Sequence, residues 1–397
     1  MKVLQINSVC GIGSTGRIVT DLYKEIEKQG YECCAAYGRG TAPDGIHSIG
    51  IGTDLDVYAH VLYTRITGKT GFASRGATEK FIKKVEEYNP DIIHLHNIHG
   101  YYINLEVLFE YFKRWKKPVI WSLYDCWTFT GHCAHFDYAG CQKWKTGCYH
   151  CQQKTSYPSC YFCDSSKNNY RRKKSIINSY DRITIVTPTN WLSSLVKNSY
   201  LSDYPTAIIP SGIDLSNFKP IESDFRSKNN LENKFIVLGV SNGFSERKGS
   251  GYFAELAKNL PENYKLVLVG VKDAERKQLP DHVLALPPTN NTMELAQLYT
   301  AADVYVNPTL EETQGLTNIE ALACGTSVIT FKSGGSPECI DPSCGIVVER
   351  GDLQGLINAI DQACKLPFDT EACMNRAKLY DKSKLFQEYI KLYEDVR

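Results

Sequence analysis

Long apolar runs and a dominant sign of charge are both missing from this chain. No segment approaches the length that a membrane-spanning helix needs. Residues 1–8 form a short apolar pattern broken by Gln5 and Asn7, which lacks the longer apolar core of a signal peptide. The formal net charge is +1, so no basic excess points to nucleic acid as a partner. These absences, with 43% hydrophobic residues, predict a cytoplasmic globular protein.

Internal repeats and low-complexity segments are also lacking, and the chain instead shows one regular order of elements. Its 397 residues exceed what one hydrophobic core usually serves, which predicts two domains. Apolar strands alternate with amphipathic helices, a pattern typical of parallel sheets with helical crossovers. We expect strands at residues 2–9, 31–36, 91–96, 118–123, 183–187, 235–240, 265–269, 304–306 and 327–330.

The strands fall into two successive sets of similar length. This predicts an α/β fold with two facing Rossmann-like domains and a cleft between them. Residues 1–208 would form the first domain and residues 209–379 the second. An amphipathic final helix, within residues 380–397, is expected to pack back on the first domain.

Cysteine, in contrast, is abundant, with 15 residues. Without an export signal we expect these cysteines to be reduced, and several are simply small core residues. A turn-rich stretch carries a separate cluster at Cys133, Cys141, Cys148 and Cys151, with a further pair at Cys160 and Cys163. The spacing favours a structural zinc site over free thiols. A catalytic metal is not expected, because so many thiolates would fill the coordination shell.

Two carboxylates, Glu312 and Glu320, bracket the segment between a buried strand and an amphipathic helix. In one continuous helix they would lie roughly 12 Å apart, too far to hold one small ligand. If the helix begins near Gly315, both face one pocket at its N-terminus, where free N–H groups and the positive dipole end favour phosphate. Hydroxyl-binding carboxylates beside a phosphate site fit a nucleotide-sugar. The alternative is a solvated loop glutamate and an exposed helical one.

Other loops follow strands of the same domain. Arg247 and Lys248 lie just before a helix and supply a planar fork and a point charge suited to diphosphate. Gly334 and Gly335 allow close backbone approach at an equivalent edge. For both segments the alternative interpretation is an ordinary solvated turn.

In the first domain, Gly11, Gly13 and Gly16 match the G-x-G-x-x-G spacing between a strand and a helix. No acidic residue ends the second strand, which disfavours a dinucleotide cofactor. The glycines instead allow a ligand close to the backbone, with charge from Arg17, or form only a tight turn.

Three further groups of polar residues lie in the same domain. His94 and His96 point to one face of a strand, as a metal pair or, preferably, as polar residues at a cleft edge. Asp125 follows the next strand and is a candidate site carboxylate. We interpret Asp54 and Asp56 as a surface turn. Basic stretches at residues 113–117 and 167–174 are solvated faces or contacts to an anionic membrane.

Assembled, these segments resemble the family 4 retaining glycosyltransferases of the GT-B fold, closest to bacterial members that build capsular polysaccharide or exopolysaccharide. The resemblance covers essentially the whole chain. Its most specific part is residues 312–328, which look like the family's E-x7-E element and the following helix and strand. Residues 333–338 look like its glycine pair. Residues 210–214 resemble the N-G-[IV]-D segment between domains, with Ser211 where Asn is usual.

The resemblance implies roles for individual residues. Glu320 would bind the ribose of the nucleotide, and Glu312 the hydroxyls of the donor sugar. Lys248, alone or with Arg247, would neutralise the diphosphate leaving group, and Asp125 would act on the acceptor side, in the first domain. The remaining donor-binding residues would be Gly13, Arg17, Gly315, Leu316, Thr317, Gly334 and Gly335.

Two positions depart from the family pattern. The loop near Gly243 lacks an Arg that relatives often carry, for which Arg247 would compensate. Tyr124 stands where relatives tend to have His, which leaves the choice of sugar open. No enzymic nucleophile is evident, and the family needs no catalytic metal.

The resulting hypothesis is a hexosyl-transferring enzyme. It would move a sugar from a nucleotide diphosphate-sugar to a polysaccharide or lipid-linked glycan, with retention of configuration. It would do so either in the cytoplasm or as a peripheral protein at the inner face of the cell membrane. The alternative is a non-catalytic sugar- or nucleotide-binding subunit of a polysaccharide assembly complex, for which Tyr124 and the altered loop are the support.

Overall fold

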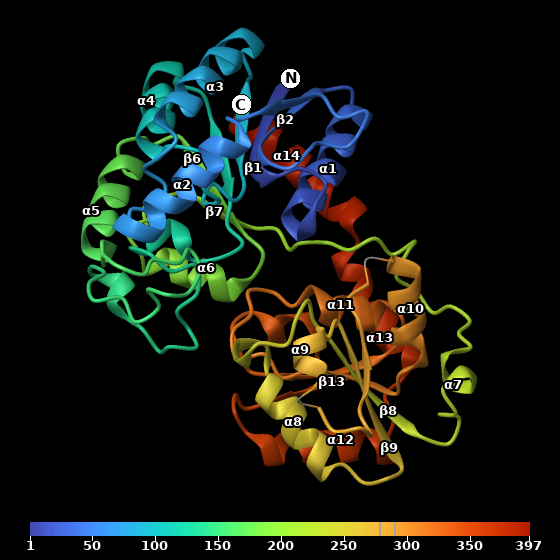
Figure 1. Cartoon of the computed structure of the whole chain (residues 1–397). Helices are drawn as coiled ribbons and strands as arrows, with labels where there is room; N and C mark the ends of the chain where they lie inside the picture. Colours follow the sequence, from blue (N-terminus) through green and yellow to red (C-terminus); the bar gives the residue numbers. More distant parts are fainter. Residues whose placement is uncertain (278, 290) are drawn as a thin grey trace. The chain divides into compact units, whose positions relative to one another are not determined.

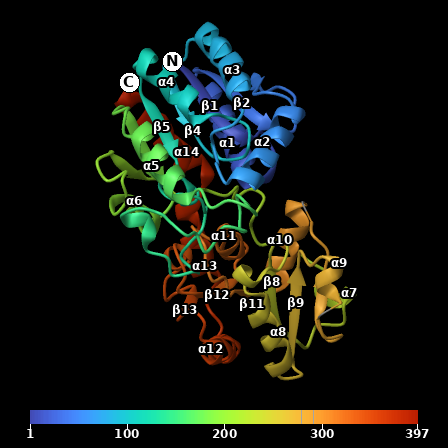
Figure 2. The same cartoon turned by 60° about the vertical axis from the view of Figure 1, so that its left-hand side comes forward.

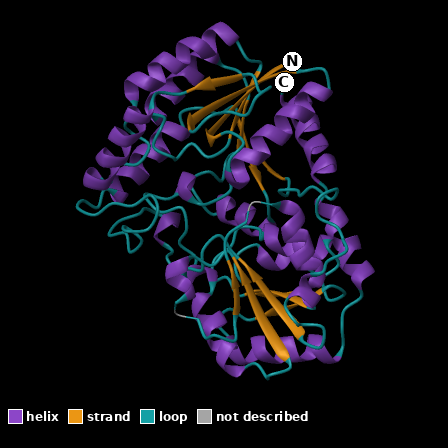
Figure 3. Cartoon of the chain, turned by 45° about the vertical axis from the view of Figure 1, so that its right-hand side comes forward, coloured by secondary structure: helices purple, strands orange, loops and turns teal. Residues whose placement is uncertain are grey.

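The computed structural model describes residues 1–277, 279–289 and 291–397. Contacts among them divide the chain into two units, one of Met1–Ile209 with Phe386–Arg397 and one of Pro210–Leu385. Each unit has a parallel sheet with helices on both sides (Figure 3). The prediction of two Rossmann-like domains is therefore confirmed for the described part of the chain.

The first unit is built on a sheet that has seven strands in the described residues, in the order β3-β2-β1-β4-β5-β6-β7. All neighbouring strands are parallel. The chain order reverses between β1 and β4, as in a doubly wound sheet. The strands are β1 Lys2–Val9, β2 Glu32–Arg39, β3 Ser48–Gly50, β4 Ile92–Leu95, β5 Val119–Ser122, β6 Ile183–Thr187 and β7 Thr206–Ile208.

Helices connect these strands as crossovers and cover the sheet (Figure 1). Apolar side chains such as Phe109 and Phe112 of α4 are buried in the main core of the unit. Residues of α14 from Phe386 onward belong to this unit, and Tyr393 donates or accepts a hydrogen bond with His94 Nδ1 at 2.7 Å. The helices are α1 Gly13–Lys28, α2 Asp54–Thr67, α3 Arg75–Tyr88, α4 Leu105–Trp115, α5 Ser166–Ile177, α6 Asn190–Lys197 and α14 Lys382–Val396, with short 3-10 turns at Trp127–Phe129 and Lys143–Lys145.

Helix α2 corrects the sequence prediction for Asp54 and Asp56. Both lie in the first turn of this helix rather than in a surface turn. Thr53 and Asp56 form a capping box, in which each side chain binds the backbone N–H of the other residue. Gly68 ends the helix in the left-handed conformation, with φ 68°.

The second unit is built on a parallel sheet with six strands in the described residues, in the order β10-β9-β8-β11-β12-β13. Here the chain order reverses between β8 and β11. The elements are β8 Phe235–Val240, β9 Tyr264–Val269, β10 Leu284–Leu286, β11 Val304–Asn307, β12 Ser327–Phe331, β13 Gly345–Val348, α7 Phe225–Lys228, α8 Ser250–Asn259, α9 Asp273–Arg276, α10 Thr292–Ala301, α11 Leu316–Ala323, α12 Leu353–Lys365 and α13 Thr370–Ala377, with 3-10 turns at Glu246–Lys248, Ser336–Cys339 and Lys378–Tyr380.

Two apolar cores lie on the two faces of this second sheet. One joins α10, α11 and α13 through residues such as Leu298, Ile319 and Cys373. The other joins α8 and α12 through Leu256 and Ile360 (Figure 2). Burial on both faces explains the continuous apolar runs of the strands. Loops gather at the edge of the sheet that is formed by the carboxyl ends of the strands.

Candidate functional site

The best-formed cluster of predicted residues lies at the point of the second sheet where the chain order reverses. Strands β8 and β11 are neighbours there, and ligands of open α/β sheets bind outside the carboxyl ends at such a point. The loop after β8 carries Arg247 and Lys248, and the loop after β11 carries Glu312. Strand β12 is next to β11 and leads to Gly334 and Gly335.

Lys248 and Glu312 form an ion pair across that point. The Nζ of Lys248 lies 2.5 Å from Oε2 of Glu312, and the two side chains are 29% and 20% exposed. Partial burial strengthens such a pair relative to one in open solvent. The second carboxylate oxygen, Oε1, accepts the N–H of Thr313 at 3.2 Å. The carboxylate is thus held in a fixed position while one edge of the pair stays open to water.

The glycine pair positions Glu312 from the other side. Gly334 has φ +56°, and a Cβ at this residue would lie 1.8 Å from the carbonyl oxygen of Glu312. Gly335 donates its N–H to that same oxygen at 3.0 Å. Only glycine permits this approach, so the backbone of Glu312 is fixed by the loop after β12.

Arg247 supports the same loop through backbone groups. One guanidinium nitrogen donates to the carbonyl of Glu311 at 3.0 Å. The carbonyl of Arg247 in turn accepts the N–H of Leu310 at 2.9 Å. Its described contacts therefore connect the loops after β8 and β11, and the side chain is half-buried.

Glu320 lies one turn inside helix α11, which begins at Leu316 after Gly315 in the left-handed conformation. No side chain caps this helix start among the described residues. One carboxylate oxygen of Glu320 accepts the hydroxyl of the buried Tyr299 at 3.0 Å. The predicted helix start near Gly315 is confirmed, and it places Glu312 outside the helix and Glu320 on it.

Tyr305 of β11 is a site residue that the sequence analysis missed. Burial raises the pKa of its hydroxyl, and the charges of Glu320 and Glu312 raise it further. Its side chain is hydrogen bonded to Thr317 at the start of α11. Both carboxylates therefore act on one buried hydroxyl. In the sequence, a Tyr within an apolar strand indicates only a core position.

A buried polar network fixes the start of α11 to the neighbouring strands. Asn307 donates to Asn318 at 2.8 Å, and Asn318 donates to the hydroxyl of Ser336 at 2.9 Å. Ser336 and Thr330 share a further hydrogen bond of 2.8 Å. These fully paired polar groups make the edge rigid.

The remaining predicted residues, Gly13, Arg17 and Asp125, belong to the first unit. Gly13 is the exposed first residue of α1, with φ +66° and open space where a Cβ would be. Arg17 is exposed one turn further along the same helix. Their positions alone do not assign a role to either residue.

Asp125 forms a buried pair with His99. Their atoms Oδ2 and Nε2 lie 2.7 Å apart. Burial alone would raise the pKa of Asp125, but the charge and hydrogen bond of His99 outweigh it, so the pKa lies below its usual value. The carboxylate also accepts the N–H of Trp127 at 2.9 Å. Asp125 is therefore an ionised, oriented acceptor of hydrogen bonds.

His94 and His96, which we preferred to interpret as polar residues at a cleft edge, are instead buried inside the first unit. They are 0% and 1% exposed and their rings lie 4.0 Å apart between centroids. His94 is hydrogen bonded to Tyr393 and to Ser122, at 2.7 and 2.8 Å. His96 is bonded to Tyr124 at 3.0 Å, so the residue that departs from the family pattern takes part in this buried network.

The four clustered cysteines line one small cavity of about 20 Å³, together with apolar side chains such as Trp144. Cys133 and Cys151 are hydrogen bonded to each other, and Cys148 accepts the N–H of Gly131 at 3.1 Å. Within the described ranges, however, no three His, Cys, Asp or Glu side chains form a group that could hold a metal ion. The zinc site stays a prediction.

Residues 221–380, which lie in the second unit, match the family model described as glycosyl transferases group 1. WcaC of Escherichia coli (strain K12), a putative colanic acid biosynthesis glycosyl transferase, is 28% identical over 172 residues, which is 40% of this chain and 41% of that protein. The similarity thus spans about two fifths of that relative. The second unit is similar to a glycosyltransferase family.

Solved structures match over nearly the whole chain. A sucrose-phosphate synthase from Thermosynechococcus elongatus has a TM-score of 0.72 and 18% identity, covering 99% of this chain and 98% of its own. The Anabaena protein HepE in complex with UDP-glucose has a TM-score of 0.68 and 16% identity, with 100% of both chains covered. The fold is therefore GT-B, the fold of glycosyltransferases.

Proposed function

We propose that the protein is a retaining glycosyltransferase of family 4. It moves a hexose from a nucleotide diphosphate-sugar to a polysaccharide or lipid-linked glycan acceptor at the cytoplasmic face of a membrane. The observation that carries the proposal is the Lys248–Glu312 pair at the reversal point of the second sheet. The match of the same unit to glycosyl transferases group 1 supports it, as does the similar fold of Anabaena HepE, which was solved in complex with UDP-glucose.

The donor would take over the contacts of the ion pair. The diphosphate attracts the ammonium of Lys248, with Arg247 adding charge from the same loop. The sugar hydroxyls donate to Glu312, whose backbone the glycine pair holds in place. Glu320 binds the ribose hydroxyls, and the N–H groups of Leu316 and Thr317 face the phosphates at the start of α11.

The chemistry follows from these positions. As the bond between the anomeric carbon and the phosphate oxygen breaks, negative charge grows on the diphosphate, and a preorganised cation and helix-end amides stabilise it. The acceptor oxygen bonds to the same face of the resulting oxocarbenium-like sugar. The acceptor proton passes to the departing phosphate oxygen. Asp125, held ionised by His99, would orient the acceptor hydroxyl by accepting its hydrogen bond.

A donor screen followed by one substitution tests the proposal. A nucleotide-sugar that binds the folded protein raises its melting temperature, which identifies the donor. With that donor, Glu312→Ala is expected to reduce the turnover number by about 100-fold or more, because the sugar loses its carboxylate. Release of nucleoside diphosphate measures the turnover.

A matched control keeps the test specific. Glu349 is an exposed carboxylate of the same unit that also pairs with a lysine, Lys332, at 2.9 Å. Glu349→Ala should leave turnover unchanged. Equal turnover of wild type and Glu312→Ala would contradict the role proposed for Glu312. Donor binding by wild type without any transfer or hydrolysis would contradict the proposed activity and favour a binding subunit.

A further inference from the structure

Two short segments of the second unit carry the chain between the two units. Residues 210–214 follow Ile209, where the long part of the first unit ends, and residues 380–385 precede Phe386, where the chain returns to that unit. These two stretches, 210–214 and 380–385, are called the connecting segments. A change at the candidate site that reaches the first unit through the polypeptide chain must pass through them.

The connecting segments are joined to each other by main-chain and side-chain contacts. Ile213 and Asp381 form an isolated parallel β-bridge. The N–H of Ile213 donates to the carbonyl of Tyr380 at 2.9 Å, and the carbonyl of Ile213 accepts the N–H of Lys382 at 3.0 Å. Lys382 also pairs with Asp214, with 2.9 Å between Nζ and Oδ2. A displacement of one segment therefore displaces the other.

Gln314 connects these segments to the Glu312 loop, which comprises residues 310–315. Its Oε1 accepts the N–H of Ser211 at 2.9 Å, and its Nε2 donates to the carbonyl of the same residue at 2.9 Å. Both bonds go to the main chain, so the contact does not depend on the Ser211 side chain. The two bonds together fix the distance and the orientation between the Glu312 loop and the first connecting segment.

The main chain of Gln314 is held in place as well. The Sγ of Cys339 donates to the carbonyl of Gln314 at 2.8 Å. The next residue, Gly315, has φ +84° and directly precedes helix α11. Glu312 lies two residues before Gln314. Under the proposed function, Gln314 thus lies between the carboxylate that binds the sugar and the helix start that faces the diphosphate.

Packing alone does not account for a glutamine at this position. Gln314 is 5% exposed, and glutamine is seldom buried because its amide must find partners for both its donor and its acceptor. An apolar side chain would fill the same space without that requirement. Here one residue, 103 positions away in the chain, satisfies both groups. A buried polar contact of this kind specifies one arrangement of the two segments that it joins.

We propose that Gln314 is a positioning residue, which couples nucleotide binding at the Glu312 loop to the connecting segments. A nucleotide that orders the loop also orders Ser211 through the two hydrogen bonds of Gln314. The bridge at Ile213 then carries that order to the segment that leads into α14. Gln314 acts through its neighbours and not on the reacting atoms. The inference rests on the proposed function and adds a route by which the occupied site affects both passages of the chain.

Two further contacts hold the second connecting segment when Gln314 is changed. The hydroxyl of Tyr380 donates to the carbonyl of Glu338 at 2.8 Å. Arg376 donates to the same carbonyl at 2.7 Å. Neither contact involves the Glu312 loop. A substitution of Gln314 should therefore remove the coupling and leave the local fold in place.

Hydrogen–deuterium exchange of the full chain tests the proposal, with UDP, GDP, ADP, CDP and dTDP as probes. In wild type, a nucleotide that binds should slow exchange by about threefold or more in residues 310–318 and in the connecting segments. Gln314→Leu removes both hydrogen bonds and keeps most of the volume. In this variant the slowing should remain in residues 310–318 and be lost in the connecting segments.

Kinetics and a second variant separate the hydrogen bonds from a loss of packing. With the donor identified by thermal shift, Gln314→Leu should lower the turnover number by about tenfold and change the donor Kd by less than about twofold. Gln314→Glu has nearly the shape of the natural residue, but its carboxylate cannot donate to the carbonyl of Ser211. It should show the same loss of coupling at neutral pH.

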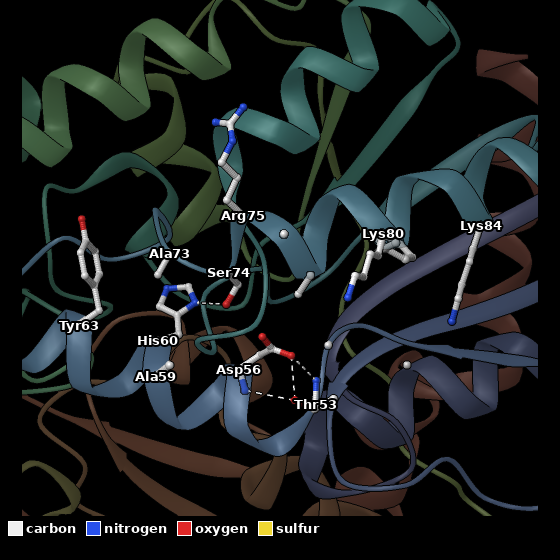
Figure 4. A pocket seen from close by; sticks show the side chains of 15 residues that line it. Thr53, Asp56, Ala59, His60, Tyr63, Ala73, Ser74, Arg75, Lys80 and Lys84 are labelled. Atoms are coloured by element: carbon white, nitrogen blue, oxygen red, sulfur yellow. Dashed lines mark hydrogen bonds between the residues drawn. The ribbon is translucent and has the colours of Figure 1, made fainter.

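The capping box of α2 provides a matched control in the first unit. The N–H and the hydroxyl of Thr53 both donate to Asp56 at 2.8 Å, at the edge of a cavity of about 640 Å³ between α2 and α3 (Figure 4). Asp56→Ala removes these two bonds, as many as Gln314→Leu removes. It should lower the melting temperature without changing the coupling or the turnover number.

Three results would overturn the inference alone. They are equal slowing in the connecting segments of wild type and Gln314→Leu, slowing confined to residues 310–318 in wild type, and a loss of the same size in Asp56→Ala. Wild-type protein that binds none of the nucleotides would overturn the proposed function, and the inference with it. The thermal shift of wild type separates the two cases, because it reports nucleotide binding independently of Gln314.

Discussion

Gly334 is the residue at which the candidate site tolerates the least change. A Cβ there would overlap the carbonyl oxygen of Glu312, and φ +56° disfavours any other side chain. Gly334→Ala should therefore displace Glu312 and destabilise the second unit by roughly 1–3 kcal/mol. We expect the turnover number to fall by about tenfold or more, measured as release of nucleoside diphosphate.

Gly251 provides the control for that substitution. It lies in helix α8 of the same unit, and nothing stands within 4 Å of its Cβ position. Gly251→Ala should leave turnover intact and slightly raise the melting temperature, because alanine favours the helix. Full activity of Gly334→Ala would show that the glycine loop does not position Glu312.

Asp214 gives a pH dependence at the residue scale. Burial acts to raise its pKa, but hydrogen bonds from Ser216 and the ammonium of Lys382 outweigh it and lower the pKa to about 2. A lowered folded pKa stabilises the protein above the unfolded value near 3.8, and that stability is lost as pH falls toward 2. Because the pair is partly exposed, we expect a contribution of about 1–2 kcal/mol at neutral pH.

Urea unfolding at several pH values checks this contribution. Asp214→Asn should lower the free energy of unfolding at pH 7, and the difference from wild type should shrink between roughly pH 4 and pH 2. In a Lys382→Met background the substitution should cost less, because the partner charge is gone. A difference that stays constant with pH would rule out the carboxylate as its source.

The segment between the Trp127–Phe129 turn and helix α5 contains the four cysteines of the predicted zinc site. In its described residues it has one short 3-10 turn, Lys143–Lys145, and otherwise irregular backbone. Buried side chains such as Phe136 and Trp144 already pack it into the core of the first unit. A zinc ion held by Cys133, Cys141, Cys148 and Cys151 would add a second constraint, and it would have to draw together side chains that form no metal-holding group in the described residues. We expect one zinc ion per chain in elemental analysis of the purified protein, and a lower melting temperature after chelation.

Single cysteine substitutions separate this site from the other cysteines. Cys148→Ser should reduce the zinc content, since it removes one thiolate. Cys364→Ser, at a half-buried cysteine of the second unit, should not. Purified wild-type protein without stoichiometric zinc would end the prediction.

At the same scale, α2 shows where periodicity fails as a guide. Apolar residues repeat with helical spacing from Leu55 to Ile66, yet they face outward, while His60 and Thr64 face inward. Periodicity identifies a helix face but does not state what that face contacts. Asp54 and Asp56 looked like turn residues because a capping box places carboxylates at a helix start, where turn formers are also common.

For the whole molecule, the order of strands along the sequence was enough to predict two parallel sheets. Buried parallel strands are continuously apolar, so segments such as 183–187 and 235–240 stand out between amphipathic helices. The positions of the loops after β8, β11 and β12 were also predictable, because ligand loops follow the carboxyl ends of such strands. The hydrogen bonds of Tyr305 and of the buried histidines could not be predicted. The partners of a side chain that points into the sheet core are distant in sequence.

In the Lys248–Glu312 pair, each side chain neutralises the charge of the other. Under the proposed function, a donor would replace both partners of the pair. Its diphosphate would take the place of Glu312 at Lys248, and its sugar hydroxyls would take the place of Lys248 at Glu312. The net gain of that exchange is smaller than the gross attraction, so affinity should depend only weakly on ionic strength. Inorganic phosphate can compete for Lys248 but offers no sugar hydroxyls to Glu312. Under the proposed function, an intact nucleotide-sugar would be selected because only it replaces both partners of this ion pair.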